Sequence, residues 1–592
     1  MSKILKSLPV LLEAVLVCLV FAALAAGPVP EVNESHYWTK AKSFWDPGYG
    51  ARDLFLQSAD AHYVFYLTLG LLAAPLKLPA AVWAARWIVW FSMACGWTYL
   101  SRSVSRPFGV AILSGGLLVA FTRWFHLAGE WVVGGAEAKG LAFACVFFAL
   151  GQACRRRWGW AWIWGGAAAA FHVLVGGWVV LAMLGVVAWQ FLSPEKCDLE
   201  LAGDTIPDPT PAVKRSGLLF HWLGLLVGGG LSLLGLLPAV ALNWNVPPEV
   251  SLAGARIYSI DRIAHHLAIW AFSPGRILAF CFLLLVWLVL ATLILFPHDK
   301  AGGVVRRAPA PLRRLLGISL GSIVIAAVGL LIGIGVLRSD LQWDTGVSLL
   351  RFYWFRCADF LVPAVVALAP FAILFPHDSK DDHWLPESVL RRRSVWSFGI
   401  CLLATGFIVG EGAVFWRQLY RDPRPAADRM SLPGNMDARR TQQYYQNWVR
   451  VCEWVRENTS QDALFLTPRS QQTFKWYSGR AEVICWKDVP QDSRSMLEWM
   501  QRAADCFPHT ESEWGFAINQ PEQLERVIKK YQVDYLLIPQ YAYELKDRFG
   551  RPLPYPMVYP KSPEQRSTFV VLDVRPQATA SQPSGEVSRD TP

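Results

Sequence analysis

Hydrophobic runs long enough to cross a bilayer recur from Leu8 to about Val409, and polar stretches separate them. A transmembrane helix needs roughly 20 mainly apolar residues. We predict eleven crossings, the first from Leu8 to about Gly27 and the others at 81–101, 106–124, 138–154, 158–175, 177–193, 216–241, 276–297, 315–337, 350–376 and 394–413. The pattern therefore predicts a mainly α-helical, polytopic membrane domain over residues 1–413.

Two segments near the N-terminus allow more than one interpretation. Lys3 and Lys6 precede an apolar run that ends in "AALAAGPVP", which is typical of either a cleaved signal peptide or an uncleaved first span. We favour the anchor because many further spans follow. The apolar stretch 61–79 could be an extra crossing, which would invert the topology. Because it is short and closes on a Pro-flanked lysine, we interpret it as a helix lying on or dipping into the outer face of the membrane.

Charge fixes the predicted orientation. Only 17% of the 592 residues are charged, against about 25% in soluble domains. The clusters at 155–157, 306–314 and 391–393 lie in short loops and mark the cytoplasmic side, which accounts for the net charge of +10 without nucleic-acid binding. The N-terminus is then cytoplasmic in the inner (plasma) membrane. The segments 28–60, 125–137, 243–275 and 338–349 and everything after about Gly412 are external.

The composition becomes polar after Trp416. Short apolar runs such as "AEVICWKD", "VDYLLIPQ" and "TFVVLDV" alternate with amphipathic segments such as "QPEQLERVIKKY". This alternation predicts a small external α/β domain over 414–576 with a mostly parallel sheet. The Ser- and Pro-rich residues 577–592 are predicted to be a disordered tail, and 194–215 an unstructured connector.

Ionisable residues gather in the predicted external segments. Carboxylates of the first loop have the chemistry of a general base or of oxygen ligands for a divalent cation. Arginines at the outer end of a late span suit a phosphate group through their fork of donors. The candidates are Glu34, Asp53 and Asp60 for catalysis, and His36, His62, Glu137, Lys139, Arg351 and Arg356 for substrate binding.

Each candidate also has a plainer interpretation. Loop acids are often only solvated, Asp60 is suited to capping a helix, and Arg351 and Arg356 are suited to anchoring a span at the interface. We interpret His126 and His172 as packing residues. In "SHYWTKAKSFW", Tyr37, Ala41, Phe44 and Trp45 have helical spacing, which predicts a short interfacial helix with Glu34 at its N-terminal end.

The layout of roughly the first 200 residues resembles the GT-C superfamily of membrane glycosyltransferases. "NESHYW" puts Glu34 at the acidic position of that family's first external loop, "SADAHYVFY" puts His62 near the start of the interfacial helix, and "AARWIVWFSMACGWTYL" resembles the second span. The resemblance implies a polyprenyl-phosphate-linked sugar donor and Glu34 as base or metal ligand. The family's paired acids are reduced here to Asn33-Glu34, and two prolines that often follow the histidine are missing.

These observations lead to a functional hypothesis with two rivals. We expect a glycosyltransferase that moves a sugar from a lipid-linked donor to a glycan, lipid or protein acceptor at the outer face, with a divalent cation as its implied cofactor. A scaffold or receptor presenting the α/β domain is the first alternative, and a transporter is the second. The whole chain also resembles integral membrane proteins of planctomycetes, through "GGAEAKG" and "RSQQTFKWYSGRAEVICWKDVPQD" among other segments, and this resemblance implies no activity.

Overall fold

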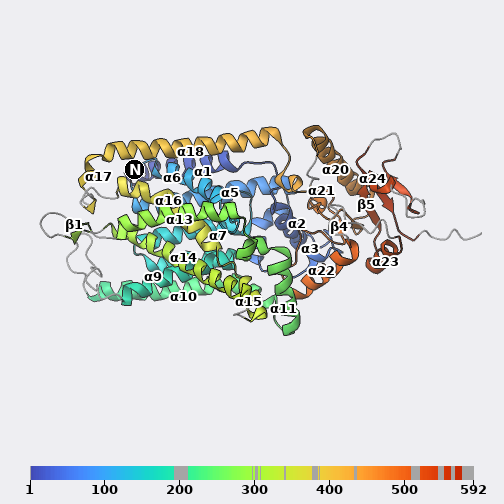
Figure 1. The fold of residues 1–592 in the computed structure, drawn as a ribbon, viewed down its shortest axis with the longest axis horizontal. Coiled ribbons are helices and arrows are strands. Elements are labelled where there is room, and N and C mark those ends of the chain that lie inside the picture. Colours follow the sequence, from blue (N-terminus) through green and yellow to red (C-terminus); the bar gives the residue numbers. More distant parts are fainter. Residues whose placement is uncertain are drawn as a thin grey trace, which may run out of the picture. The chain divides into compact units, whose positions relative to one another are not determined.

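The structure is a computed structural model and describes a large part of the chain. The described residues are 2–192, 211–295, 298–299, 305–306, 308–338, 342–376, 384–385, 387–431, 436–508, 521–544, 553–561 and 567–576. The predicted tail at 577–592 and most of the predicted connector, 194–210, lie outside these residues. The described chain is mainly helical and divides into two compact units (Figure 1).

Unit 1 comprises Met1–Pro47, Phe55–Leu432 and Asp488–Met500. Each predicted crossing coincides with a helix of this unit, because long apolar runs form helices that satisfy their own backbone groups. These helices are α1 (Ser2–Ala25), α5 (Leu78–Val104), α6 (Val110–Trp124), α7 (Ala138–Cys154), α8 (Trp158–Phe171), α9 (Val173–Leu192), α10 (Pro211–Ala241), α13 (Pro274–Leu295), α14 (Ala310–Leu337), α16 (Arg356–Leu374) and α18 (Arg393–Arg421).

Eight helices of the described chain are long and apolar enough to cross a membrane. The remaining three predicted crossings correspond to shorter helices, α6, α7 and α8, of 15, 17 and 14 residues. The close approach of α8 to α10 depends on glycine: a Cβ at Gly166 would lie 1.9 Å from the carbonyl oxygen of Gly228. The fold is therefore a polytopic helical membrane domain, and its orientation in the membrane stays a prediction.

The loops between these helices lie at two ends of the bundle. At one end, which we call the basic end, Arg102 binds Glu13 of α1, Arg155 binds Ser103 and Arg393 binds the carbonyl of Leu374. At the other end, which we call the site end, lie the loops 125–137, 242–273 and 342–355 and the residues of the first loop that belong to unit 1. The predicted sorting of basic and external loops thus corresponds to two ends of one helix bundle.

Short elements build the site end. They are α2 (Glu34–Trp45), α3 (Leu54–Gln57), α4 (Tyr63–Leu67), η1 (Leu69–Ala73), α11 (Pro248–Arg256), η3 (Ile257–Arg262), α12 (Ala264–Leu267), η4 (Ile269–Ala271), α15 (Trp343–Leu350) and α19 (Ala426–Arg429). The helix predicted in "SHYWTKAKSFW" is α2. It buries Trp38 and Ala41 while Phe44 and Trp45 are about one-third exposed. The stretch 61–79 forms two helices of five residues, α4 and η1, which are too short to cross a bilayer.

Three further elements follow spans that end at the basic end. They are α17 (Glu387–Arg391) and the paired strands β1 (His298–Asp299) and β2 (Val305–Arg306).

Unit 2 comprises Gly48–Leu54, Pro433–Lys487 and Gln501–Pro592. Each unit therefore takes a segment that the sequence predicts for the other: seven residues of the first loop in unit 2, and Asp488–Met500 in unit 1.

Unit 2 contains a five-stranded sheet in the order β4-β3-β5-β7-β6. Its strands are β3 (Leu464–Leu466), β4 (Ala481–Glu482), β5 (Tyr535–Pro539), β6 (Met557–Tyr559) and β7 (Phe569–Asp573), and the helices near them in the chain are α20 (Ala438–Asn458), α21 (Phe474–Ser478), α22 (Ser493–Cys506), α23 (Pro521–Tyr531) and α24 (Gln540–Glu544). The strands β3, β4 and β5 pair in parallel, but β7 is antiparallel to both β5 and β6. The prediction of a mostly parallel sheet is wrong, because only two of the four strand pairings are parallel.

Candidate functional site

Glu34 is the first residue of α2, and its carboxylate is fully enclosed at the site end of unit 1. Arg86 of α5 binds it through two hydrogen bonds, Nε to Oε1 at 2.7 Å and a terminal nitrogen to Oε2 at 2.6 Å. The backbone N–H groups of Ala136 and Glu31 donate to the same two oxygens at 2.7 and 2.8 Å. Both side chains are 0% exposed. Four donors thus use the acceptor capacity of this carboxylate.

A metal ion does not fit at Glu34. Each of its oxygens already accepts two hydrogen bonds, and the cation beside it is the guanidinium of Arg86. A divalent cation bound there would have to displace a buried Arg–carboxylate pair. The family resemblance assigns Glu34 as base or metal ligand, whereas its contacts assign it to joining α2, α5 and the loop 125–137. Use of a cation elsewhere in the chain stays a prediction.

The loop 125–137 is held from two sides. Asp359 of α16 accepts hydrogen bonds from the N–H groups of Leu127 and Ala128 at 2.7 and 2.8 Å. Near the other end of the loop, the indole N–H of Trp38 donates to the carbonyl of Ala136 at 2.8 Å. A Cβ at Gly135 would lie 2.8 Å from Oε1 of Glu34, so only glycine fits there without displacement. These contacts hold both ends of the loop and thereby fix the position of Glu130 in its middle.

Five polar residues from four segments meet beside this loop, and we call them the Arg356 cluster: Glu130, Glu137, Lys139, His172 and Arg356. Glu130 Oε2 lies 2.6 Å from Nε of Arg356, and its Oε1 lies 3.0 Å from Nζ of Lys139. Lys139 also lies 3.7 Å from Glu137. Glu137 and Glu130 are 2% and 5% exposed, while Lys139 and Arg356 are 9% and 13% exposed. The cations are thus the more accessible members.

Aromatic rings support both cations. The ammonium of Lys139 lies 3.8 Å from the ring centre of Trp131, and the guanidinium of Arg356 lies 3.9 Å from that of Tyr353. Tyr353 adopts a left-handed backbone conformation with φ of 53°, and its hydroxyl bonds that of Tyr258 at 3.0 Å. Such cation–π contacts fix the position of a charge without neutralising it.

The two glutamates of the cluster differ in their proton affinity. Burial alone would raise the pKa of Glu130, but the charges of Arg356 and Lys139 outweigh it and hold that pKa below its usual value. Burial raises the pKa of Glu137 despite the charge of Lys139. Within the described residues, Oε1 of Glu137 is buried without a hydrogen-bond partner. Glu130 is therefore the charged partner of the two cations, and Glu137 is the carboxyl that favours its proton.

His62 and Asp60 form a second polar group, which we call the Asp60–His62 dyad. Asp60 Oδ1 accepts hydrogen bonds from the backbone N–H of His62 at 2.7 Å and from its ring Nδ1–H at 2.8 Å. Tyr66 donates to Oδ2 at 2.9 Å, and Lys40 lies 3.6 Å from the same oxygen. Burial alone would raise the pKa of Asp60, but His62 and Lys40 hold it well below its usual value. Asp60 is therefore a fixed anion.

His172 connects the dyad to the Arg356 cluster. It lies between α8 and α9, with Nε2 accepting a hydrogen bond from Arg356 at 3.2 Å, and its ring centre is 5.7 Å from that of His62. An arginine can only donate, so Nε2 of His172 carries a lone pair and the ring is neutral. The interpretation of His172 as a packing residue thus omits its polar contacts, whereas His126 bonds only locally in the described chain, to the N–H of Gly129.

A small pocket of about 260 Å³ borders the dyad on the side of α2. Polar side chains of Lys40, Ser58 and Asp60 line it together with the aromatic rings of Phe44, Tyr63 and Tyr66.

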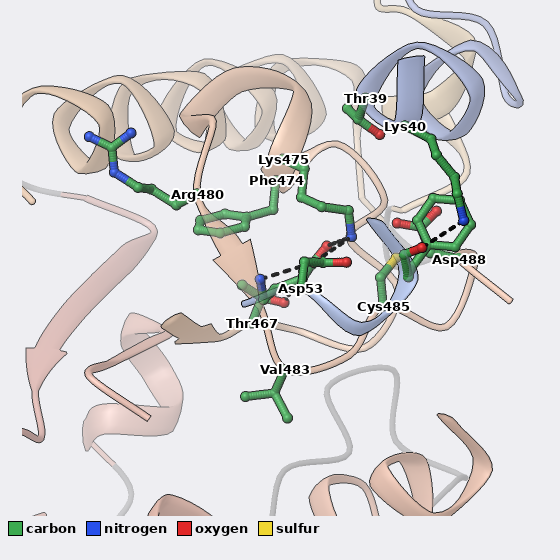
Figure 2. A network of polar contacts seen from close by, with 12 residues as sticks. Thr39, Lys40, Asp53, Thr467, Phe474, Lys475, Arg480, Val483, Cys485 and Asp488 are labelled. Carbon is green, nitrogen blue, oxygen red and sulfur yellow. Dashed lines mark hydrogen bonds and ion pairs between the residues drawn. The ribbon is translucent and has the colours of Figure 1, made fainter. Parts of the chain in front are cut away.

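Three predicted residues lie apart from these groups. His36 bonds Asp488 at 3.0 Å. Arg351 directly follows α15, and no hydrogen bond or ion pair of the described residues joins it to the Arg356 cluster. Asp53 belongs to unit 2, where it lies 3.2 Å from the ammonium of Lys475, and the two side chains point toward each other (Figure 2). The candidates taken from the sequence omitted Arg86, Glu130 and His172. The signal available for Arg86 was a charged residue near the start of a predicted span, and for Glu130 a carboxylate in a predicted external loop.

The comparisons with known proteins add little to this geometry. A family model described as a domain of unknown function (DUF6798) matches residues 446–506. No curated protein matches the chain. An oligosaccharyltransferase from Archaeoglobus fulgidus, in a crystal structure with Zn and sulfate, is 12% identical, with 89% of this chain and 68% of that chain covered and a TM-score of 0.37.

A second structure is the archaeal oligosaccharyltransferase AglB from the same organism, in complex with an inhibitory peptide and a dolichol-phosphate. It is 13% identical, with 97% of this chain and 75% of that chain covered and a TM-score of 0.38. A likeness at this level carries no argument about function. The resemblance to planctomycete proteins stays a prediction.

Proposed function

We propose that this protein is a membrane glycosyltransferase that takes a sugar from a polyprenyl-phosphate-linked donor at the site end of unit 1. The observation that supports the proposal is the Arg356 cluster, in which two cations are held by aromatic rings among apolar helices. Ionisable groups buried among membrane helices are costly to desolvate and are candidates for a function. The layout that resembles the GT-C superfamily points to the same reaction.

The cluster has the properties of a phosphate site. Arg356 offers planar, paired donors and Lys139 offers a point charge, and the two are joined by one shared carboxylate, Glu130. A phosphate that approaches the more exposed cations would compete with Glu130 for both of them. The pKa of Glu137 is raised by burial, so this carboxyl takes up a proton more readily than an ordinary glutamate.

The proposed roles follow from the contacts. Arg356 and Lys139 bind the phosphate, and Glu137 and His172 complete the lining. Glu34 is a positioning residue that acts through Arg86, and His36 positions α2 through Asp488. Arg351 and Asp53 remain candidates from the sequence without a contact that gives them a role in the cluster. The acceptor is a glycan, lipid or protein at the external face.

Binding of polyprenyl phosphate to the purified chain in lipid nanodiscs tests this proposal. The wild type should bind undecaprenyl monophosphate and not undecaprenol, and Arg356→Gln should weaken the affinity at least about tenfold. Arg276→Gln is the matched control, because Arg276 is exposed at the start of α13, at the same end of the bundle. Equal binding of the phosphate and the alcohol would contradict the proposal. It would favour the alternative of a non-catalytic scaffold, which the saturated contacts of Glu34 also permit.

A further inference from the structure

The Asp60–His62 dyad has no part in holding a phosphate, yet it lies next to the Arg356 cluster. Its carboxylate cannot itself take a proton from a substrate, because His62, Tyr66 and Lys40 surround it. Its charge acts on the imidazole instead. Asp60 is 5% exposed and His62 is 14% exposed, so the ring is the accessible member of the dyad.

The contacts of His62 settle which ring nitrogen carries the hydrogen. Nδ1 lies 2.8 Å from the carboxylate of Asp60 and 3.0 Å from the side-chain amide nitrogen of Gln491. Gln491 is oriented by the N–H of Ala61, which donates to its amide oxygen at 3.1 Å. Because a charged carboxylate is the stronger partner, Nδ1 carries the hydrogen and donates to Asp60. Nε2 is then the basic nitrogen of the ring.

Nε2 of His62 faces one hydroxyl group, that of Tyr37. The phenol oxygen of Tyr37 lies 3.4 Å away, which is longer than the 2.7–2.8 Å of a well-formed hydrogen bond to a hydroxyl. The acceptor capacity of Nε2 is therefore only weakly used. On the other side of the ring lies His172, which in turn accepts a hydrogen bond from Arg356. A base and the phosphate-binding cation are thus separated by one neutral ring.

We infer that His62 is the general base of the transfer, oriented by Asp60, and that the acceptor atom is a hydroxyl oxygen. The inference rests on the proposed function. In the step, the acceptor oxygen attacks the anomeric carbon and its proton moves to Nε2 of His62. The bond from that carbon to the phosphate oxygen breaks, and the polyprenyl phosphate leaves with the electron pair, held by Arg356 and Lys139. The proton on His62 then passes to solvent.

The chemistry of the base selects the acceptor class. A neutral imidazole oriented by a carboxylate is suited to taking the proton of an attacking hydroxyl. An amide nitrogen is a poor nucleophile because its lone pair is delocalised into the carbonyl, and loss of its proton to an imidazole is strongly unfavourable. The carboxylate best placed by sequence to assist such an acceptor, Glu34, is saturated by four donors. A sugar hydroxyl or a Ser or Thr hydroxyl has the chemistry that the dyad requires.

Chemical rescue tests the role of His62. The wild type and His62→Gly are assayed in nanodiscs with a panel of polyprenyl-phosphate-linked sugars, with release of polyprenyl phosphate as the readout. We expect kcat to fall at least about 100-fold in His62→Gly, the affinity for undecaprenyl monophosphate to stay within about threefold, and added imidazole to restore about tenfold. His126→Gln is the control and should keep wild-type kcat.

A second pair of variants separates positioning from folding. Asp60→Asn keeps the shape of the side chain, so its kcat should fall about tenfold with KM unchanged. Tyr66→Phe removes only a hydrogen bond to Asp60 and should lower kcat less than about threefold. Loss of kcat in His62→Gly without rescue by imidazole, or an unchanged kcat in both dyad variants, would overturn the inference.

The acceptor class is tested with three probes: methyl glycosides, a Ser-containing peptide and an Asn-containing peptide. Transfer to either hydroxyl probe supports the inference and tells the two sources apart, whereas transfer to the Asn amide overturns it. A wild type that binds undecaprenyl monophosphate but neither transfers nor hydrolyses any donor also overturns it. Failure of the proposed function has a different signature, since the wild type would then not distinguish undecaprenyl monophosphate from undecaprenol.

Discussion

Two arginine–glutamate pairs at the site end of unit 1 differ in how completely their contacts are filled. The Glu34–Arg86 pair is 0% exposed, and its carboxylate accepts hydrogen bonds from four donors. The Glu130–Arg356 pair shares its carboxylate with Lys139, and its arginine is 13% exposed. The carboxylate of the first pair has no acceptor capacity left for a ligand, whereas the second pair contains the more exposed arginine, which we propose to bind a phosphate.

The difference shows why an acidic residue at a family's catalytic position is a weak guide to its role. A buried charge must be paired, and once its hydrogen-bonding capacity is used it contributes to structure and positioning. Where two cations share one carboxylate, as in the Arg356 cluster, a bound anion would add ion pairs. In this chain, the Arg356 cluster contains Glu130 from a loop and His172 from between two helices, and neither residue lies in one of the segments that resemble the GT-C superfamily.

The largest expected effect comes from breaking the saturated pair. Glu34→Gln leaves the guanidinium of Arg86 buried without a counter-charge, so the free energy of unfolding should fall by about 3–5 kcal/mol. Denaturant unfolding in micelles measures this loss. Replacing both residues, as in Glu34→Met with Arg86→Met, should recover much of the stability. A Glu34→Gln protein as stable as the wild type but inactive would return Glu34 to a catalytic role.

Removing the charge of Glu130 in the Arg356 cluster should lower the free energy of unfolding by less than Glu34→Gln does. Glu130→Gln removes the charge that Arg356 and Lys139 share, and we expect a loss of about 2 kcal/mol at neutral pH. Because the folded-state pKa of Glu130 is lowered, its stabilisation is present above the usual glutamate pKa and is lost as pH falls through the folded value. The difference in unfolding free energy between wild type and variant should therefore shrink below about pH 4. A difference that grows on acidification would contradict this assignment.

Conservative Arg→Lys changes compare the two pairs directly. Arg356→Lys keeps the charge but loses the paired donors, so the affinity for undecaprenyl monophosphate should fall about tenfold, or about 1.4 kcal/mol. Its unfolding free energy should change less than that of Arg86→Lys, which breaks the two hydrogen bonds to Glu34. Titrations with undecaprenyl monophosphate and unfolding curves of the two variants test whether Arg356→Lys mainly weakens binding and Arg86→Lys mainly lowers stability. Equal loss of stability with equal binding in both would remove the distinction between the pairs.

The smallest effect is expected at Glu137. Its raised folded-state pKa means that the native state favours the proton, so its contribution to stability is present at low pH and is lost as pH rises through the folded value. Gln resembles the protonated acid, so Glu137→Gln should match the wild type near pH 4 and be more stable by less than about 1 kcal/mol at pH 8. A pH series of thermal unfolding compares the two proteins. The prediction would be contradicted if the stability of Glu137→Gln relative to wild type were lower at pH 8 than at pH 4.

The amino-acid sequence by itself determined the helices and their ends. A long apolar run must form a helix in lipid because no other partner for its backbone is available, and the Arg clusters mark one set of ends. The pattern around Glu34 likewise predicts α2. The alternation of runs in the C-terminal part predicts an α/β unit, though not the antiparallel pairing of β7, since strand order depends on contacts far apart in the chain.

Only the tertiary structure decided which charges meet. Glu34 finds Arg86 52 residues away, and the N–H groups of Leu127 and Ala128 find Asp359 more than 230 residues away. The assignment of residues 48–54, including Asp53, to unit 2 likewise depends on contacts between segments far apart in the sequence. Helix formation is local, so periodicity in the sequence records it. Ion pairing between segments depends on how the helices pack, and neither the spacing nor the composition of a single segment records that packing.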